Sequence, residues 1–270
     1  MPATRQPLSV VIITLNAASQ LADCLASVGF ADEVVVVDSG STDGTRELAA
    51  AAGARVIAQD WLGFGRQKQF AVEVAGHDWV LCLDADERVS DELRQAIENS
   101  LASTSTVAAY RFARCNRFLG RYLRHGEGYP DWSLRFFDRR QARWSDDAVH
   151  EKVLTGGPVA TLPGDLLHDS AETLASYLAK QNRYTSLAAE MAVAAGKRAS
   201  AGHLVFSPLV RFVKFYLFRQ GFRDGLPGLI HIAIGCFNSF CKYAKMRELI
   251  QLKAAGASQR TLSAGSDQTV

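Results

Sequence analysis

The chain has 270 residues and a mass of 29.4 kDa, enough for one large domain or for one domain with an appended module. With 48% hydrophobic and 21% charged residues, its composition is that of an ordinary globular protein. The formal net charge of +2 is too small to indicate a nucleic acid as a partner.

The cysteines and the N-terminal segment both indicate the cytosol. The five cysteines form no CxxC pair and have no regular spacing, so we expect reduced thiols rather than a disulfide framework or a zinc site. The apolar run from Leu8 to Leu15 is short, and no signal-peptide cleavage site follows it. We therefore expect a cytoplasmic protein.

Strand and helix patterns alternate over the first hundred residues. The segment LSVVIITL, residues 8–15, is a β-branched run typical of a strand covered on both faces. A helical pattern follows Asn16, which can cap it. Further strands are expected at residues 33–38, 54–59 and 78–84, and further helices at 42–53, 65–75 and 90–101. This alternation predicts an α/β fold with a parallel sheet.

Polar residues stand where three of these strands end. Asn16, Asp38 and Asp84 each follow an apolar strand at its carboxyl end. Ligands of open α/β sheets bind beyond the carboxyl ends of the strands. We therefore expect these three residues at one binding edge.

The pattern changes after residue 105. Strands are expected at residues 107–120 and 132–140, separated by a loop rich in glycine and aromatic residues, and a long helix at 171–195. The last third is apolar and aromatic, interrupted by Lys and Arg, and contains no run of the roughly 20 apolar residues that a spanning helix needs. This pattern favours amphipathic helices in a membrane interface, the alternative being ordinary core helices. The small, polar segment from Ala254 is expected to be disordered.

The segment WVLCLDADERV, residues 79–89, places Asp84, Asp86 and Glu87 directly after a buried strand. Such an Asp-x-Asp offers hard oxygen ligands that suit Mg²⁺ or Mn²⁺. The alternative is a solvated turn at the end of the strand.

A second motif, DSGSTDGT, occupies residues 38–45. Asp38 can accept hydrogen bonds from a base or a ribose, and the neighbouring hydroxyl groups and glycines can shape a tight loop. Neither a Walker loop nor a GxGxxG motif follows a strand, which disfavours an ATPase or a nicotinamide enzyme.

Together, VVIITLN, VVVVDSGSTDGT and WVLCLDADERV resemble, in this order and spacing, the nucleotide-sugar-binding half of family 2 glycosyltransferases, which have the GT-A fold. The resemblance implies a Rossmann-like mixed sheet flanked by helices. It also implies that Asp38 contacts the nucleotide base, that Asp84 lies near the ribose and that Asp86 binds the metal ion. The remaining residues expected to bind the nucleotide-sugar are Thr14, Asn16, Ser41, Asp43, Arg66, Lys68 and Ala85.

The likeness to one branch of the family extends from about Leu8 to Leu249. The segments GFGRQKQFAVEVAGHDWVLCLDADERV, DDAVHEKV, GDLLHDS, LASYLAKQNRYTS and FRQGFRDGLPGLIHI resemble bacterial lipopolysaccharide core transferases of the WaaE/KdtX type. Gln69 departs from the Asn expected in many relatives.

Inverting transfer, which the resemblance implies, needs a base near the acceptor hydroxyl. Glu151 is the favoured base, with Asp131, Asp146 and Asp147 as rivals, and its alternative is a surface carboxylate. His168 is expected to add a metal ligand, or else to be structural. The residues expected to contact the acceptor are Trp132, His150 and Arg121.

These patterns predict a metal-dependent inverting glycosyltransferase that moves a hexose or heptose from a nucleotide-sugar, a UDP-sugar or ADP-heptose, to a lipopolysaccharide core or related glycolipid. It would work at the cytoplasmic face of the inner membrane. Another envelope polysaccharide or polyprenyl-linked acceptor, and a non-catalytic membrane-associated scaffold, remain alternatives. The expected parts are a nucleotide-sugar-binding half (1–105), an acceptor-binding half (106–170), a helical extension (171–253) and a disordered tail (254–270).

Overall fold

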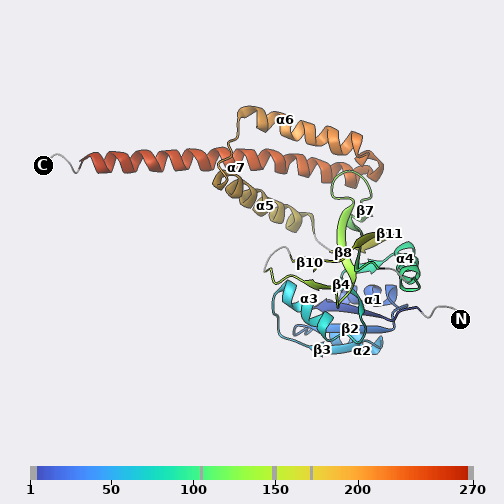
Figure 1. The fold of residues 1–270 in the computed structure, drawn as a ribbon. Helices are drawn as coiled ribbons and strands as arrows, with labels where there is room; N and C mark the ends of the chain where they lie inside the picture. Colours follow the sequence, from blue (N-terminus) through green and yellow to red (C-terminus); the bar gives the residue numbers. More distant parts are fainter. Residues whose placement is uncertain (1–4, 104–105, 148–150, 171–172, 267–270) are drawn as a thin grey trace. The chain divides into compact units, whose positions relative to one another are not determined.

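A computed structural model describes residues 5–103, 106–147, 151–170 and 173–266 of the chain, with the side chains described up to residue 255. The chain forms two compact units (Figure 1). The sheet unit comprises residues 1–117 and 129–170, and the helical unit comprises residues 118–128 and 171–270. All five cysteines are free thiols, as predicted.

The sheet unit is built on a mixed sheet with the strand order β3-β2-β1-β4-β8-β6-β11-β5. Its first half is parallel, whereas β8 runs antiparallel between β4 and β6. The strands of this path are β1 (Leu8–Thr14), β2 (Glu33–Asp38), β3 (Arg55–Ala58), β4 (Trp79–Asp84), β5 (Glu87–Val89), β6 (Ala109–Phe118), β8 (Asp131–Asp138) and β11 (Val159–His168). A separate hairpin pairs β9 (Ala142–Trp144) with β10 (Val153–Thr155).

The β-branched run of β1 is buried on both faces, as its pattern predicts. One face packs against residues of α1 (Ala18–Ser27), α2 (Thr45–Ala51) and α4 (Asp91–Leu101). The other face packs against α3 (Phe64–Glu73) and β9. Ser90 caps α4 by accepting a hydrogen bond from the Leu93 amide, whereas α1 begins without a side-chain cap, so Asn16 does not have the capping role we predicted.

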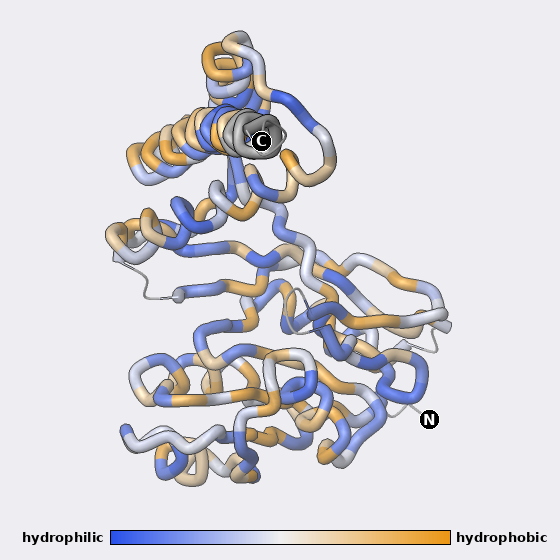
Figure 2. Tube along the Cα trace, turned by 90° about the vertical axis from the view of Figure 1, so that its left-hand side faces the viewer, coloured by the Kyte–Doolittle hydropathy of each residue, from blue (hydrophilic) through white to orange (hydrophobic). Residues whose placement is uncertain are grey.

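The helical unit contains α5 (Leu174–Ala194), α6 (Ala201–Phe212), the π-helix η1 (Val213–Phe218), the 3₁₀ turn η2 (Gly221–Asp224) and α7 (Gly225–Ser266). Apolar and hydrophilic residues alternate along these helices in Figure 2. α5 and α6 both pack against α7. None of the described helices is both long enough and apolar enough to cross a membrane.

Two expectations about domain limits differ from the structure. The segment Phe118–Gly128, with the short strand β7 (Arg121–Tyr122), belongs to the helical unit rather than to the acceptor-binding half. It is held there by Asp224, whose carboxylate accepts a 2.7 Å hydrogen bond from the His125 amide. In addition, α7 continues through residues 254–266, where we expected a disordered tail.

Candidate active site

The ends of β1, β2 and β4 lie side by side at one edge of the sheet. Thr14 pairs with Asp38 in the register of β1 with β2, and Ile13 pairs with Asp84 in the register of β1 with β4. Parallel pairing therefore brings together residues that are far apart in the sequence. The structure thus confirms that these strand ends meet at one edge of the sheet.

A cleft of about 570 Å³ opens at this edge. Six residues that we predicted as part of the site line it, namely Thr14, Asn16, Asp84, Ala85, Asp86 and His168. The sequence analysis missed the other six lining residues: Ile13, Leu15, Ala17, Gln20, Trp61 and Phe64. Trp61 and Phe64 are exposed aromatic residues in edge-to-face contact, and their position just after a strand is a sequence signal that could have identified them.

Asp38 is buried and is not among the residues that line the cleft. It is 1% exposed, and its carboxylate accepts hydrogen bonds from the hydroxyls of Thr14 and Ser41 and from the amides of Gly40 and Ser41. Burial opposes ionisation, but these hydrogen bonds outweigh it and lower the pKa of Asp38. In this structure Asp38 therefore shapes the loop after β2.

The loop of residues 38–45 is tied to the turn after β1. The Asn16 side chain accepts a 2.9 Å hydrogen bond from the Thr42 amide, and the Asn16 amide donates to the Ser41 hydroxyl. Asp43 accepts a hydrogen bond from the Ala18 amide at the start of α1. Asn16, Ser41 and Asp43 thus fix the backbone around the cleft.

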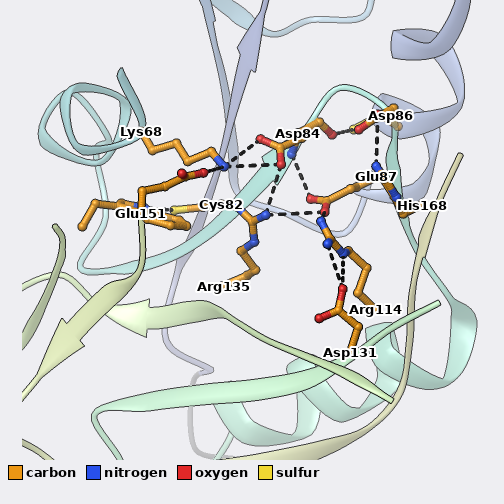
Figure 3. Close-up of polar contacts among 12 residues, drawn as sticks. Lys68, Cys82, Asp84, Asp86, Glu87, Arg114, Asp131, Arg135, Glu151 and His168 are labelled. Atoms are coloured by element: carbon orange, nitrogen blue, oxygen red, sulfur yellow. Dashed lines mark hydrogen bonds and ion pairs between the residues drawn. The ribbon is translucent and has the colours of Figure 1, made fainter. Parts of the chain in front are cut away.

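Lys68 connects two carboxylates that we assigned to different tasks (Figure 3). Its ammonium lies 3.1 Å from Asp84 Oδ1 and 3.0 Å from Glu151 Oε1, and its side chain is only 4% exposed. The ring of Trp144 lies 5.0 Å from the same ammonium. Lys68 therefore faces the interior of the sheet unit and does not line the cleft, whereas Arg66 is exposed on another side of α3.

Arg135 of β8 is a buried member of this cluster that the sequence analysis missed. Its guanidinium lies 3.1 Å from Asp84 Oδ2 and 3.6 Å from Glu87 Oε1. Although burial opposes the charge of Asp84, Arg135 and Lys68 hold the pKa of that carboxyl well below its usual range. A cation between apolar residues of the strand DWSLRFFD is the signal that could have revealed it.

Glu87 does not line the cleft, in contrast to Asp84 and Asp86. It is fully buried, and its Oε2 accepts a 3.0 Å hydrogen bond from the Asp84 amide. Burial raises the pKa of Glu87, in spite of the nearby Arg135 guanidinium. Glu87 therefore holds the backbone at Asp84, where the acidic turn begins, from the buried side.

Asp86 and His168 form the pair that can bind a metal ion. His168 Nε2 lies 3.2 Å from Asp86 Oδ2, and His168 Nδ1 lies 2.7 Å from the side-chain oxygen of Asn116. Because Nδ1 faces the Asn116 oxygen, Nε2 is the ring nitrogen on the side of Asp86 and the one available to a metal ion. β11 supplies His168 because it lies beside β6 and β5.

The donor set fits Mg²⁺ or Mn²⁺ that shares its ligands with a substrate. Among the residues described, no three His, Cys, Asp or Glu side chains are grouped to enclose a metal ion. A carboxylate and an imidazole supply two ligands, and such ions commonly complete their coordination with water and substrate phosphates.

The residues expected to contact the acceptor are not gathered in the cleft. Trp132 is 49% exposed on β8, where its ring lies 5.2 Å from the Arg111 guanidinium. Arg121 belongs to the helical unit and donates a hydrogen bond to the Arg223 carbonyl. His150 lies outside the described residues.

The rival bases have other partners or lie away from Lys68. Asp131 is paired with Arg114 at 2.8 Å, and Asp146 lies 3.8 Å from Arg143. Asp147 is exposed. Of the four carboxylates considered, Glu151 is the one bound to Lys68.

Comparison with known proteins decides the family. Residues 9–156 match the model of glycosyl transferase family 2. The chain is 35% identical over 256 residues to the lipopolysaccharide core biosynthesis glycosyltransferase LpsC of Rhizobium meliloti, a match that covers 92% of this chain and 94% of that protein. The chain belongs to glycosyl transferase family 2.

A further relative of this family 2 glycosyltransferase and a solved structure are also similar to the chain. An uncharacterized glycosyltransferase of Rickettsia typhi is 32% identical over 254 residues, with 90% of this chain and 87% of that protein covered. The solved structure of the mannosyltransferase PcManGT from Pyrobaculum calidifontis, in complex with GDP-Man and Mn²⁺, has a TM-score of 0.50 at 19% identity and covers 91% of this chain and 88% of that chain. This likeness confirms the predicted GT-A fold.

Proposed function

We propose that this family 2 glycosyltransferase uses a divalent metal ion to transfer a sugar from a nucleotide-sugar to a lipopolysaccharide core or related glycolipid acceptor. The observation that carries the proposal is the pairing of Asp86 with His168 in the lining of the cleft at the strand ends. The mannosyltransferase structure with GDP-Man and Mn²⁺ supports a nucleotide-sugar and a metal for this fold. The name of the Rhizobium meliloti relative supports the acceptor class.

Asp86 and His168 would hold Mg²⁺ or Mn²⁺, and the bound ion would neutralise charge on the leaving diphosphate. Asn116 keeps the imidazole of His168 in the orientation that this requires. Asp84 stays ionised beside it because Lys68 and Arg135 are close. The charged side chains that line the cleft are therefore already in position before the donor binds.

Glu151 is the base in this proposal. It takes the proton of the acceptor hydroxyl while that oxygen attacks the anomeric carbon, and the bond to the nucleoside diphosphate breaks. A single displacement of this kind inverts the configuration of the sugar. The Lys68 ammonium, 3.0 Å away, holds the Glu151 carboxylate in place.

The donor is proposed to be a UDP-sugar or ADP-heptose, and the acceptor to be anchored in lipid. Such an acceptor requires the protein to work at the cytoplasmic face of the inner membrane. A different lipid-linked saccharide would need the same site, so acceptor assays distinguish these substrates.

Calorimetric titration of UDP, GDP, ADP and dTDP into the full-length protein, with and without Mn²⁺, tests the proposal. We expect one nucleotide to bind in a Mn²⁺-dependent way, and Asp86→Asn to weaken that binding at least about tenfold because a charged ligand is lost. The matched control is Asp91→Asn, which makes the same change at an exposed position in the first turn of α4. Absence of nucleotide binding under every condition would overturn the proposal.

A further inference from the structure

The helix α6 and the π-helix η1 that follows it direct their apolar side chains outward. None of their residues is buried. Phe206 is 64% exposed, Val210 is 63% exposed and Phe218 is 80% exposed. We call the exposed apolar residues of these two helices the outer face: Val205, Phe206, Leu209, Val210, Leu217 and Phe218.

The outer face is not the result of a loosely attached helix, because the opposite side of α6 has defined contacts. The Ser207 hydroxyl lies 2.7 Å from the Ser239 hydroxyl of α7. Arg211 forms an ion pair with Glu127. A Cβ at Gly235 of α7 would lie 2.3 Å from Glu127 Oε2 and 3.1 Å from Arg211 Nε, so this glycine leaves room for the ion pair.

The sequence spacing agrees with these contacts. Positions 205, 209 and 206, 210 recur every four residues and therefore share one side of a helix. A helix at an ordinary water-facing surface has the reverse arrangement, with its apolar side inward. An exposed apolar face of this kind marks an interaction surface.

The charge of the segment indicates the partner. Residues 191–223 contain no Asp or Glu but contain six cations, namely Lys197, Arg198, Arg211, Lys214, Arg219 and Arg223. Lys214, Arg219 and Arg223 are exposed beside the outer face. Apolar residues flanked by Lys and Arg are typical of helices that lie in the interface of an anionic membrane.

We propose that the outer face inserts into the headgroup region of an anionic lipid membrane and holds the enzyme there. This proposal rests on the proposed function, because an enzyme that acts on a lipid-anchored acceptor has to reach it at a membrane surface. A second copy of the chain is a poorer occupant, since self-association through this face would bring like charges together.

Sedimentation of the full-length protein with lipid vesicles tests the surface. We expect binding to vesicles of phosphatidylcholine with phosphatidylglycerol, weak binding to phosphatidylcholine alone, and a decrease with added salt. The double variant Phe206→Asp and Phe218→Asp should bind anionic vesicles at least about tenfold more weakly, because two carboxylates replace inserted aromatic rings. Both positions are exposed, so the variant should fold, which circular dichroism checks.

The matched control for net charge is Leu154→Asp with Val159→Asp, two exposed apolar residues of the sheet unit. This control should bind vesicles like the wild type. Equal vesicle binding by both double variants, or no binding by the wild type, would overturn the proposal. A dimer that light scattering detects in the wild type but not in the outer-face variant, with no vesicle binding, would identify a second copy as the occupant and would also overturn it.

Nucleotide titration separates the failure of this proposal from failure of the proposed function. The outer-face variant should retain the Mn²⁺-dependent nucleotide binding of the wild type, because the outer face lies outside the residues of the cleft. Loss of vesicle binding with nucleotide binding intact supports the membrane surface. If the wild type binds vesicles but no nucleotide, the membrane-binding surface is supported and the proposed transferase mechanism is overturned.

Discussion

At the scale of single residues, the least expected result concerns Lys68. The sequence analysis assigned it to the nucleotide-sugar, but in the structure it is buried between Asp84 and Glu151. A buried ammonium is stable only when it is paired, and here two carboxylates pair with it. Its position links the donor side of the site to the proposed base.

Replacing this ammonium should therefore affect both folding and catalysis. We expect Lys68→Met to lower the free energy of unfolding by about 3 kcal/mol, because it leaves two carboxylates without a shared partner. We also expect kcat to fall at least about tenfold while the donor KM changes little, because Glu151 loses its anchor. Urea unfolding and steady-state kinetics measure the two effects.

Arg66→Met is the control for stability. It removes a cation from an exposed position of the same helix and should change the unfolding free energy by less than about 0.5 kcal/mol. If Lys68→Met were as stable and active as this control, the linking role of Lys68 would be wrong.

At the scale of elements, the close approach between α3 and the chain after β9 builds the site. Gly65 permits this approach: a Cβ at this position would lie 2.3 Å from the Ser145 carbonyl oxygen and 3.4 Å from Glu151 Cβ. The same helix carries Lys68, one turn further along. The contact between Lys68 and Glu151 thus depends on the absence of a Cβ at Gly65.

Gly65→Ala should separate α3 from this segment. In a helix without a steric clash, alanine is more stable than glycine by up to about 1 kcal/mol. A loss of stability in this variant would therefore result from the clash. We expect destabilisation of about 1–3 kcal/mol and a lower kcat. Thermal unfolding and kinetics provide the measurement.

Gly29→Ala is the matched control, because its Cβ would meet one backbone oxygen at an ordinary 3.8 Å. It should be close to neutral. Increased stability and unchanged kcat in Gly65→Ala would show that the close approach is not needed.

At the scale of the whole molecule, the two units are not consecutive pieces of sequence. Residues 118–128 leave the sheet unit between β6 and β8 and join the helical unit. Asp224, which is 2% exposed, holds this segment through the amide and the ring nitrogen of His125. The helical unit therefore includes residues 118–128, which a division of the sequence into consecutive segments places in the acceptor-binding half.

Asp224→Ala should release this segment. We expect a loss of about 1–3 kcal/mol of stability, because two half-buried donors of His125 lose their buried acceptor. Hydrogen exchange should become faster in residues 118–128 and stay unchanged in β1 and β4. Glu248→Ala, at an exposed position of α7, should alter neither quantity. Uniformly faster exchange in the sheet unit would contradict the assignment of this segment.

The sequence by itself determined the alternation of strands and helices, the Asp-x-Asp after β4 and the family. These features are readable because strand and helix periods, and residues next to each other in a motif, are local properties of the chain. It also identified His168 as a candidate ligand, although not the Asn116 that orients it.

Only the tertiary structure decided which side chains meet. Arg135 reaches Asp84, and Glu87 turns inward, because β8 lies antiparallel between β4 and β6. Asn116 meets His168 because β11 pairs with β6. Strand order and helix packing arise from contacts between distant parts of the chain, and no local pattern encodes them.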